Sequence, residues 1–434
     1  MRTSLDKVVP NHMRHFFPSY RVPQLNFSDG YLPVRVPGCA SCVESTLATG
    51  LPALGRLTTE QVIDHVVAVN TLNGKSGLLG KVELQVGGAV EQEALKELIP
   101  RFKSGELQVE PVAVVLPDPE CVAPLAGTGL REVGVQFGAS DYMSVGQGPG
   151  SREVPVRALL ETLDACLEAG FTPRLDLLDI TRADLESLVI PLVSDVMDHL
   201  SSCGFGGLHL RLVDSLGLGL PWPEIPVPRS IPRMVHTLTH KLDIPGDQVE
   251  FLGFNDMGMA LANSLAAAVH GCTRIVTTMG GLGERAGVAP TELMLIHLCG
   301  LYGIDLDLKR VKELFKGLKL AGGELSPRHP LWGEEGLTRG FAPHPNALAA
   351  THALEAPFDA YRLLGRAPDV KVRQENGPAG LVCMIKRNFP ETEYGCDDQL
   401  ILDLFAWVEE QELGDICWDD LRDKVQELAP DLFV

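Results

Sequence analysis

The segment from Val249 to Glu292 reads VEFLGFNDMGMALANSLAAAVHGCTRIVTTMGGLGERAGVAPTE and carries the strongest signal of the fold. Two short apolar runs in it, Glu250–Asn255 and Arg274–Thr278, have the length and composition of buried strands. Between them, Met257–His270 has the length and composition of a helix. A strand, a helix and a second strand in this order predict parallel strands joined by a helical crossover.

The same alternation extends toward the N-terminus. Six further short apolar runs predict strands at Ser41–Thr46, Val82–Val86, Val112–Leu116, Val133–Phe137, Arg174–Asp179 and Leu208–Asp214. Helical patterns lie between several of them, at Thr59–Asn70, Val156–Ala169, Arg182–Leu200 and Pro228–Lys241. Eight strands alternating with helices over roughly 260 residues predict an α/β protein with a closed (β/α)8 TIM barrel rather than an open sheet.

The pattern divides the chain into three regions. Residues 1–38 form an N-terminal extension, and residues 39–303 form the barrel. After residue 303 the strand pattern stops, so residues 304–434 are predicted to be a mainly helical region that covers the barrel mouth or serves dimerisation. Its predicted helical stretches are Asp305–Leu318, Ala347–Leu364 and Gln399–Leu428.

Composition excludes several classes of partner. The net charge of −20 argues against nucleic acid and anionic membranes, because both require clustered Lys and Arg. The sequence contains no run of about 18 apolar residues, so no membrane span is predicted. Its first residues lack the apolar core of a signal peptide, and its ten cysteines are scattered as in proteins with reduced thiols. We therefore expect a cytoplasmic protein.

Polar side chains gather where the predicted strands end. In a barrel of this kind the chemistry collects at the C-terminal ends of the strands. Any one of these residues alone would be read as a loop residue or a helix cap, but together they predict a single site at the barrel mouth. They are Glu44, Ser140, Asp141, Asp179, Thr181, Arg182, Asp214, Ser215, Asn255, Asp256 and the run from Gly280 to Arg285.

Several ordered motifs resemble the Claisen-type acyltransferases, the family of isopropylmalate, homocitrate, citramalate and Re-type citrate synthases, with the related hydroxymethylglutaryl-CoA lyase. The most specific motif is Gly281-Leu282-Gly283-Glu284-Arg285-Ala286-Gly287. Further matches are Asp179-Ile180-Thr181-Arg182-Ala183-Asp184, Asp214-Ser215-Leu216-Gly217, Ser140-Asp141-Tyr142 and, near the N-terminus, Phe17–Pro23. The resemblance looks closest to the Re-type citrate synthase branch. It implies a pyruvate-carboxyltransferase-like barrel, acyl-CoA and 2-oxo acid ligands, and a dimer.

The same resemblance exposes a conflict at the metal site. The family pattern His-x-His-Asn-Asp is replaced by Leu252-Gly253-Phe254-Asn255-Asp256, and the Asn that closes the glycine-rich motif is replaced by Val288. The alignment places Glu44 at the Asp of the first-strand motif. The resemblance implies that these positions hold a divalent metal that polarises the oxo acid. Because Glu44 alone can offer an oxygen, no metal is predicted there, and Mn²⁺ or Mg²⁺ would require a relocated site.

Other catalytic positions of the family also change. Its first-strand Arg aligns with Ala48, its fourth-strand His with Met143, and its fifth-strand Glu with Leu178. The candidate catalytic residues that remain are Glu44, Arg182 and His344, a histidine in the stretch that resembles the family's lid. The predicted substrate-binding residues are Ser140, Asp179, Thr181, Asp214, Ser215, Asn255, Asp256, Glu284 and Arg285. For Glu284 and Arg285, a structural role through charge-assisted hydrogen bonds is favoured over direct catalysis.

Two functions remain open from the sequence. The chain is either a divergent acyl-CoA:2-oxo acid enzyme with metal-free chemistry based on Glu44, or a catalytically silent relative. A silent relative would bind a metabolite or regulate an active paralogue as its partner in a heteromer. Alternation along the sixth strand adds one structural expectation: if Asp214 points to the mouth, His209 faces the helix layer.

Overall fold

The computed structural model describes most of the chain from residue 37 onward. The described residues are 37–85, 89–146, 153–304, 307–333, 335–339, 364–365, 369–374, 377–389, 391–411 and 415–433. They form two compact units. One holds the barrel and Glu313–Glu324, and the other holds Asp307–Lys312 and the chain from Leu325 onward.

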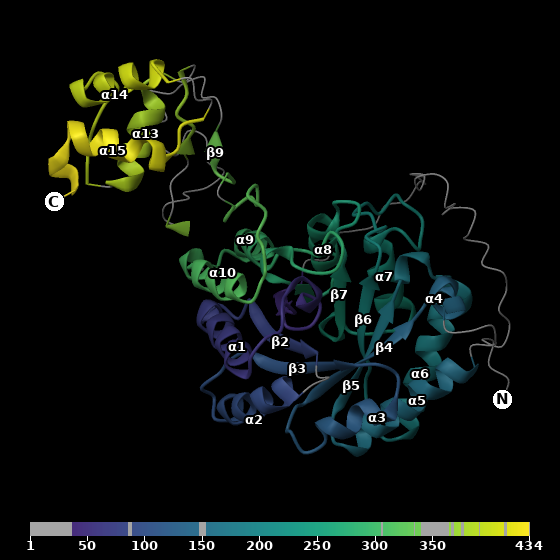
Figure 1. The fold of residues 1–434 in the computed structure, drawn as a ribbon. Helices are drawn as coiled ribbons and strands as arrows, with labels where there is room; N and C mark the ends of the chain where they lie inside the picture. Colours follow the sequence, from purple (N-terminus) through teal and green to yellow (C-terminus); the bar gives the residue numbers. More distant parts are fainter. Residues whose placement is uncertain are drawn as a thin grey trace. The chain divides into compact units, whose positions relative to one another are not determined.

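Eight parallel strands close into a barrel in chain order (Figure 1). Each pairs with the next, and the last pairs with the first. They are β1 (Ser41–Glu44), β2 (Leu79–Gln85), β3 (Glu110–Val115), β4 (Glu132–Gly138), β5 (Thr172–Leu178), β6 (His209–Asp214), β7 (Val249–Gly253) and β8 (Arg274–Thr277). All eight predicted strands are confirmed, and with them the (β/α)8 barrel.

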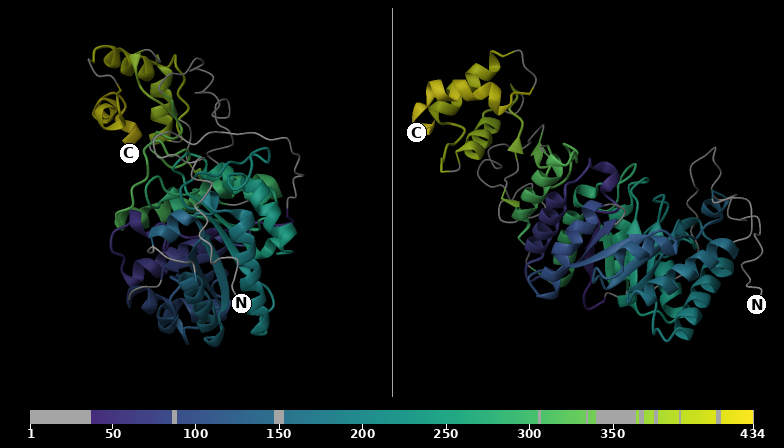
Figure 2. Two further views of the ribbon diagram at one scale, coloured as in Figure 1. Left: turned by 90° about the vertical axis from the view of Figure 1, so that its right-hand side faces the viewer. Right: turned by 60° about the horizontal axis from the view of Figure 1, so that its bottom comes forward.

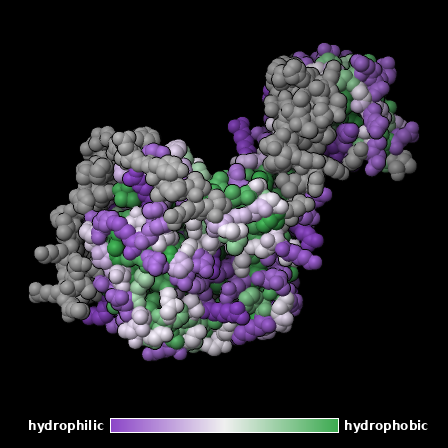
Figure 3. Space-filling model, turned by 180° about the vertical axis from the view of Figure 1, so that it is seen from behind, coloured by the Kyte–Doolittle hydropathy of each residue, from purple (hydrophilic) through white to green (hydrophobic). Residues whose placement is uncertain are grey.

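Helices surround the strands, as the two views of Figure 2 show. The principal helices of this part of the chain are α1 (Thr59–Asn73), α2 (Ala89–Lys103), α3 (Pro119–Val122), α4 (Asp141–Gly146), α5 (Glu153–Glu168), α6 (Ile190–Ser202), α7 (Ile231–Lys241), α8 (Ala260–Val269), α9 (Thr291–Tyr302) and α10 (Val311–Leu320). Hydrophilic and hydrophobic side chains are mixed over the face of the barrel unit that Figure 3 presents. Within the described residues, no helix combines the length and the apolar character that a membrane span requires.

Helix α1 shows how local sequence sets an element that positions the site. The Thr58 hydroxyl accepts a hydrogen bond from the Gln61 backbone N–H at 3.2 Å, and the Gln61 side chain accepts one from the Thr58 N–H at 2.9 Å. This reciprocal cap fixes the first turn because it satisfies two N–H groups that the helix cannot. The buried face of α1 then includes Val62, Val66 and His65, which lies against the end of β1.

Charged side chains fill the lower part of the barrel interior. Arg174 of β5 is fully buried and contacts Glu83, Glu132 and Asp176 at 2.7–2.8 Å. A Cβ atom at Gly134 of β4 would clash with the Arg174 guanidinium, so glycine makes room for it. Barrels of this type usually pack branched apolar side chains here. In this part of the interior, a network of ion pairs takes their place.

The network extends around the barrel and shifts the acidity of its members. Arg211 of β6 lies 2.7 Å from both Glu83 and Glu250, and Lys81 of β2 lies 2.6 Å from Glu132. Burial raises the pKa of Glu250, but the nearby cations Arg174, Arg211 and Lys81 outweigh it and lower the value to about 2. Glu250 is therefore ionised at neutral pH despite its burial.

His209 belongs to this network, which corrects the expectation that it faces the helix layer. Its Nδ1 atom lies 2.8 Å from Glu132, a residue of β4. His209, Arg211 and Val213 alternate along β6 and point inward, so Asp214 has the opposite orientation. The error arose from the premise that Asp214 points into the barrel.

The C-terminal unit has a core of its own. It contains α13 (Ala379–Asn388), α14 (Gln399–Glu409), α15 (Trp418–Leu428) and the short parallel pair β9 (Thr338–Arg339) and β10 (Asp369–Val370). The buried residues of this core include Leu381, Ile385, Ile401, Leu404 and Leu421. Residues 380–384, a short apolar run in the sequence, form part of α13.

Candidate functional site

The carboxylate of Glu44 ends β1 and faces the helix layer. Its Oε2 atom lies 2.8 Å from Nε2 of His65 on α1, and its Oε1 atom accepts hydrogen bonds from the Thr46 hydroxyl and, at 3.1 Å, the Thr46 backbone N–H. The Thr46 hydroxyl in turn accepts a bond from the Met279 N–H at 2.8 Å. Glu44 is fully buried. It therefore ties the end of β1 to α1 and to the segment after β8.

An apolar cluster occupies the barrel interior near the ends of the strands. Its buried members come from β1, β6, β7, β8 and the segment that follows β8. They are Val43, Val213, Leu252, Val276 and Val288, with Leu178 and Phe254 packed against them. The inward residue of β1 in this cluster is Val43, not Glu44. The Glu44 carboxylate therefore points away from Leu252, Phe254 and Val288, with which the alignment groups it.

This cluster does not fit the divalent metal that the resemblance implies. Leu252, Phe254 and Val288 offer no lone pair, whereas such ions bind through several oxygen or nitrogen atoms. Phe254 and Val288 also pair through their backbones in an antiparallel bridge. Three of the four aligned metal positions, Leu252, Phe254 and Val288, are thus brought together in space, but their side chains are apolar.

Asp179 connects three of the predicted site residues. It follows β5 in the left-handed backbone region, with φ of 60°. Its carboxylate accepts a hydrogen bond from Ser140 and two from Arg182, at 2.9 Å from Nε and 2.6 Å from Nη2. Arg182 also lies over the ring of Tyr142, 4.1 Å from its centre. Charge-assisted bonds of this kind fix geometry, so Asp179 holds the loops after β4 and β5 together.

Asp214 holds the loop after β6. It accepts hydrogen bonds from the Thr181 hydroxyl at 2.6 Å and from the backbone N–H groups of Leu218 and Gly219 at 3.0 and 2.8 Å. Burial raises the pKa of Asp214 to about 6, against the lowering effect of these hydrogen bonds. The neighbouring Ser215 hydroxyl accepts the Asp179 backbone N–H at 2.8 Å. The ends of β5 and β6 are therefore joined twice.

Arg285 connects the segment after β8 with the ends of β6 and β7. Its guanidinium donates to Asp256 at 2.6 and 3.1 Å and to the Ser215 carbonyl at 2.6 Å. It also lies over the Phe254 ring, 4.8 Å from its centre. Glu284 contacts Arg285 at 3.3 Å and is exposed, so it contributes little. These contacts support a structural role for Arg285, which joins the strand ends.

Asn255 completes this region through local contacts. Its backbone N–H donates to the Gly287 carbonyl at 2.8 Å, and its side-chain oxygen accepts the Ala260 N–H at 3.3 Å. It therefore joins the glycine-rich motif to the start of α8. Of the predicted site residues, His344 and the segment Phe17–Pro23 lie outside the described part of the chain.

Sequence reasoning missed two residues that complete these contacts. His65 is the partner of Glu44, and Tyr142 is the partner of Arg182. The position of His65 on the buried face of α1 was a signal, because a buried imidazole requires a polar partner.

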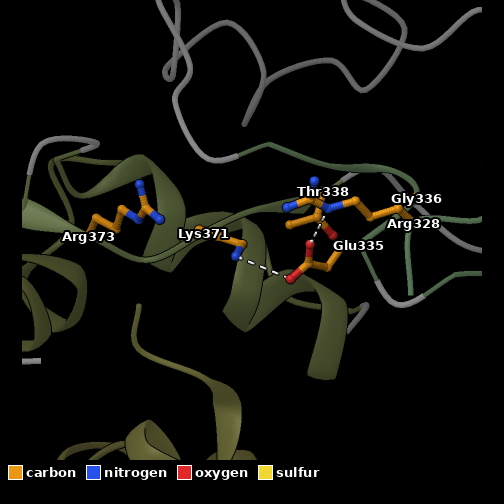
Figure 4. Close-up of a pocket in the computed structure, with 6 residues that line it drawn as sticks. All are labelled: Arg328, Glu335, Gly336, Thr338, Lys371 and Arg373. Atoms are coloured by element: carbon orange, nitrogen blue, oxygen red, sulfur yellow. Dashed lines mark hydrogen bonds and ion pairs between the residues drawn. The ribbon is translucent and has the colours of Figure 1, made fainter. Parts of the chain in front are cut away.

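A separate cavity of about 390 Å³ lies in the C-terminal unit (Figure 4). Its charged lining residues are largely paired: Lys371 lies 3.4 Å from Glu335, and Arg328 lies 3.3 Å from the same carboxylate. Lys371 and Arg373 also contact Asp415. All three cations therefore lie beside an acid of the same unit, Glu335 or Asp415.

The fold is that of an eight-stranded parallel barrel, and residues 121–314 match the HMGL-like family model. The chain is 26% identical to citrate (Re)-synthase of Clostridium kluyveri over 93% of its own length and 89% of the relative. It is 28% identical to 2-phosphinomethylmalate synthase of Streptomyces hygroscopicus over 96% of both chains. The resemblance to the Claisen-type acyltransferases is confirmed.

Solved structures give the same fold. A hydroxymethylglutaryl-CoA lyase from Brucella melitensis superposes with a TM-score of 0.51 at 18% identity, covering 66% of this chain and 99% of that one. The lyase from Pseudomonas aeruginosa gives the same TM-score and covers 67% and 95%. At this identity the likeness concerns the barrel alone.

Proposed function

We propose that the chain is a divergent member of the Claisen-condensing synthases that does not perform a metal-dependent condensation. The apolar cluster formed by Val43, Val213, Leu252, Val276 and Val288 carries this proposal. A metal-assisted condensation needs an ion to polarise the carbonyl of the oxo acid. Hydrocarbon cannot hold that ion, and a charged oxo acid loses its hydration on entering such a surface without compensation.

The side-chain contacts favour a catalytically silent protein. Such a chain would bind a metabolite or act as a regulatory partner subunit. The two described residues with expected catalytic roles already have strong partners, Glu44 in His65 and Arg182 in Asp179. A base that is fully buried against a helix cannot reach a substrate proton without breaking those bonds. The remaining alternative is metal-free chemistry based on Glu44.

The test is release of CoA from acetyl-CoA by the full chain with oxaloacetate, pyruvate or 2-oxoglutarate, in Mn²⁺ or in chelator. CoA should be measured by chromatography, because the exposed Cys39, Cys203 and Cys417 would consume a thiol reagent. The citrate (Re)-synthase of Clostridium kluyveri is the positive control. We expect no release above the uncatalysed rate. Release that requires Mn²⁺ would overturn the proposal.

Release that is insensitive to chelator would favour the metal-free alternative, and Glu44→Gln would then decide whether Glu44 is the base. If no CoA is released, the partner role predicts that the chain co-purifies from its native cells with a homologue that retains His-x-His. A chain that elutes alone and is not stabilised by acyl-CoA or by any of the three oxo acids would contradict that role.

A further inference from the structure

Three side chains of the metal-binding type meet on the helix layer, away from the strand ends. Asp164 comes from α5, His199 from α6, and Cys203 directly follows α6. The His199 Nε2 atom lies 2.7 Å from Asp164 Oδ1, and the Cys203 Sγ atom lies 3.7 Å from the same oxygen. All three ligand atoms lie within 4.8 Å of one another.

The sequence places two of these ligands on one face of α6. His199 and Cys203 are four residues apart, the spacing that brings side chains together on a helix. The Cys203 backbone N–H donates to the His199 carbonyl at 3.1 Å, so helical geometry extends to the cysteine. This is also the C-terminal end of the helix, where the unpaired carbonyl groups favour a cation. Asp164 on the adjacent helix supplies a negative charge opposite them.

We propose that Asp164, His199 and Cys203 form a zinc site that joins α5 to α6. Carboxylate oxygen, imidazole nitrogen and thiolate sulfur are the ligands of zinc, at about 2.0–2.3 Å from the ion. Tetrahedral geometry at these distances separates ligand atoms by about 3.3–3.8 Å. The Cys203 Sγ and Asp164 Oδ1 atoms are 3.7 Å apart, within this range. The His199 Nε2 and Asp164 Oδ1 atoms are 2.7 Å apart and must separate slightly when the ion binds.

The surroundings allow the ion to enter and complete its shell. Cys203 is exposed, and the side chains of His199 and Asp164 are 27% and 41% exposed. Water takes the fourth position, and the Cys203 thiol releases its proton to solvent as the thiolate binds. The site lies outside the barrel, so it is independent of the proposed loss of chemistry at the strand ends. A bound ion would link two neighbouring helices of the outer layer.

The experiment uses the full chain, freed of metal with a chelator and then titrated with Zn²⁺ against a chromophoric competitor. We expect each chain to bind one Zn²⁺ ion tightly. Titration with Co²⁺ should give a thiolate-to-cobalt charge-transfer band. Cys203→Ser should abolish the band. We expect a weaker affinity for Zn²⁺ in each of three variants: Cys203→Ser, His199→Gln and Asp164→Asn. The loss should exceed the roughly 10–100-fold that removal of a residue outside the ligand shell costs.

Two matched variants control for other surface ligands. Cys39→Ser removes another exposed cysteine of the same unit. His240→Gln disrupts the stacked histidine pair on α7, whose ring centres are 3.9 Å apart. Both should keep the tight equivalent and the cobalt band. Circular dichroism establishes that each variant is folded. Tight binding that survives both Cys203→Ser and His199→Gln, a cobalt complex without a thiolate band, or no tight equivalent in the parent chain would overturn the proposal.

Discussion

The Nε2 atom of His65 on α1 lies 2.8 Å from the Oε2 atom of Glu44, the last residue of β1. Both side chains are buried, so the contact is shielded from water. The pair fixes the first helix of the barrel against the first strand. Because His65 belongs to the helix layer, the pair also explains why the Glu44 side chain does not face the barrel interior.

We expect this pair to act as a unit in folding. Glu44→Ala should lower the free energy of unfolding by about 3–5 kcal/mol, because it leaves buried donors without an acceptor. The double variant with His65→Ala should cost less than the sum of the two single variants, by about 1–3 kcal/mol. Urea unfolding followed by circular dichroism measures all three. Additive effects would mean that the two side chains do not interact.

Shortening Leu252 tests the apolar cluster. Leu252→Ala should lower the free energy of unfolding by about 2–5 kcal/mol, because Leu252 is only 5% exposed and its neighbours cannot collapse fully into the space. Leu116→Ala is the control, since Leu116 is 62% exposed, and it should change stability by no more than about 0.5 kcal/mol. Equal effects of the two variants in urea unfolding would contradict the packing described for Leu252.

Removal of one cation should lower the free energy of unfolding strongly inside the barrel and very little on its surface. Arg174→Met leaves Glu83, Glu132 and Asp176 with too little positive charge and should cost at least about 3–5 kcal/mol. Arg101→Met removes a surface arginine of α2 paired with Glu106 and should cost about 1 kcal/mol or less. The midpoints of urea unfolding give the comparison. A neutral Arg174→Met would show that the network is not coupled as its distances indicate.

Asp214 should make stability depend on pH in the opposite sense to most carboxylates. Its pKa is raised from 3.8 to about 6 by burial, so the folded chain holds a proton that the unfolded chain has released between these values. The free energy of unfolding should therefore fall as pH rises from 4 to 6, by up to about 3 kcal/mol relative to Asp214→Asn. Parallel pH profiles of the two proteins would exclude the raised pKa.

The eight strands could be predicted from sequence because each is a short run that contains several apolar residues and is followed by a turn. Asp179, Asp214 and Arg285 could be placed at strand ends for the same reason, but their hydrogen-bond partners could not. Orientation at β1 was not predictable. A shift of one residue reverses the face of every side chain, and the alignment placed Glu44 where Val43 lies.

The charged interior could not be predicted from single strands. Arg174 and Asp176 alternate with leucines along β5, and Arg211 does the same along β6. In one strand such alternation indicates a face exposed to water. Only closure of the barrel shows that these polar faces meet one another, because the partners lie on strands far apart in sequence.

The ion network within the barrel also limits how this sequence can diverge. Arg174 contacts acids on three strands, and Arg211 shares two of the same acids, Glu83 and Asp176. A change to any one residue leaves several buried charges without compensation, so the network can be replaced only by coordinated substitutions. The apolar cluster carries no such linkage, and each of its side chains can be exchanged for another of similar volume. Single substitutions among the apolar side chains therefore disturb this barrel less than single substitutions within its ion network.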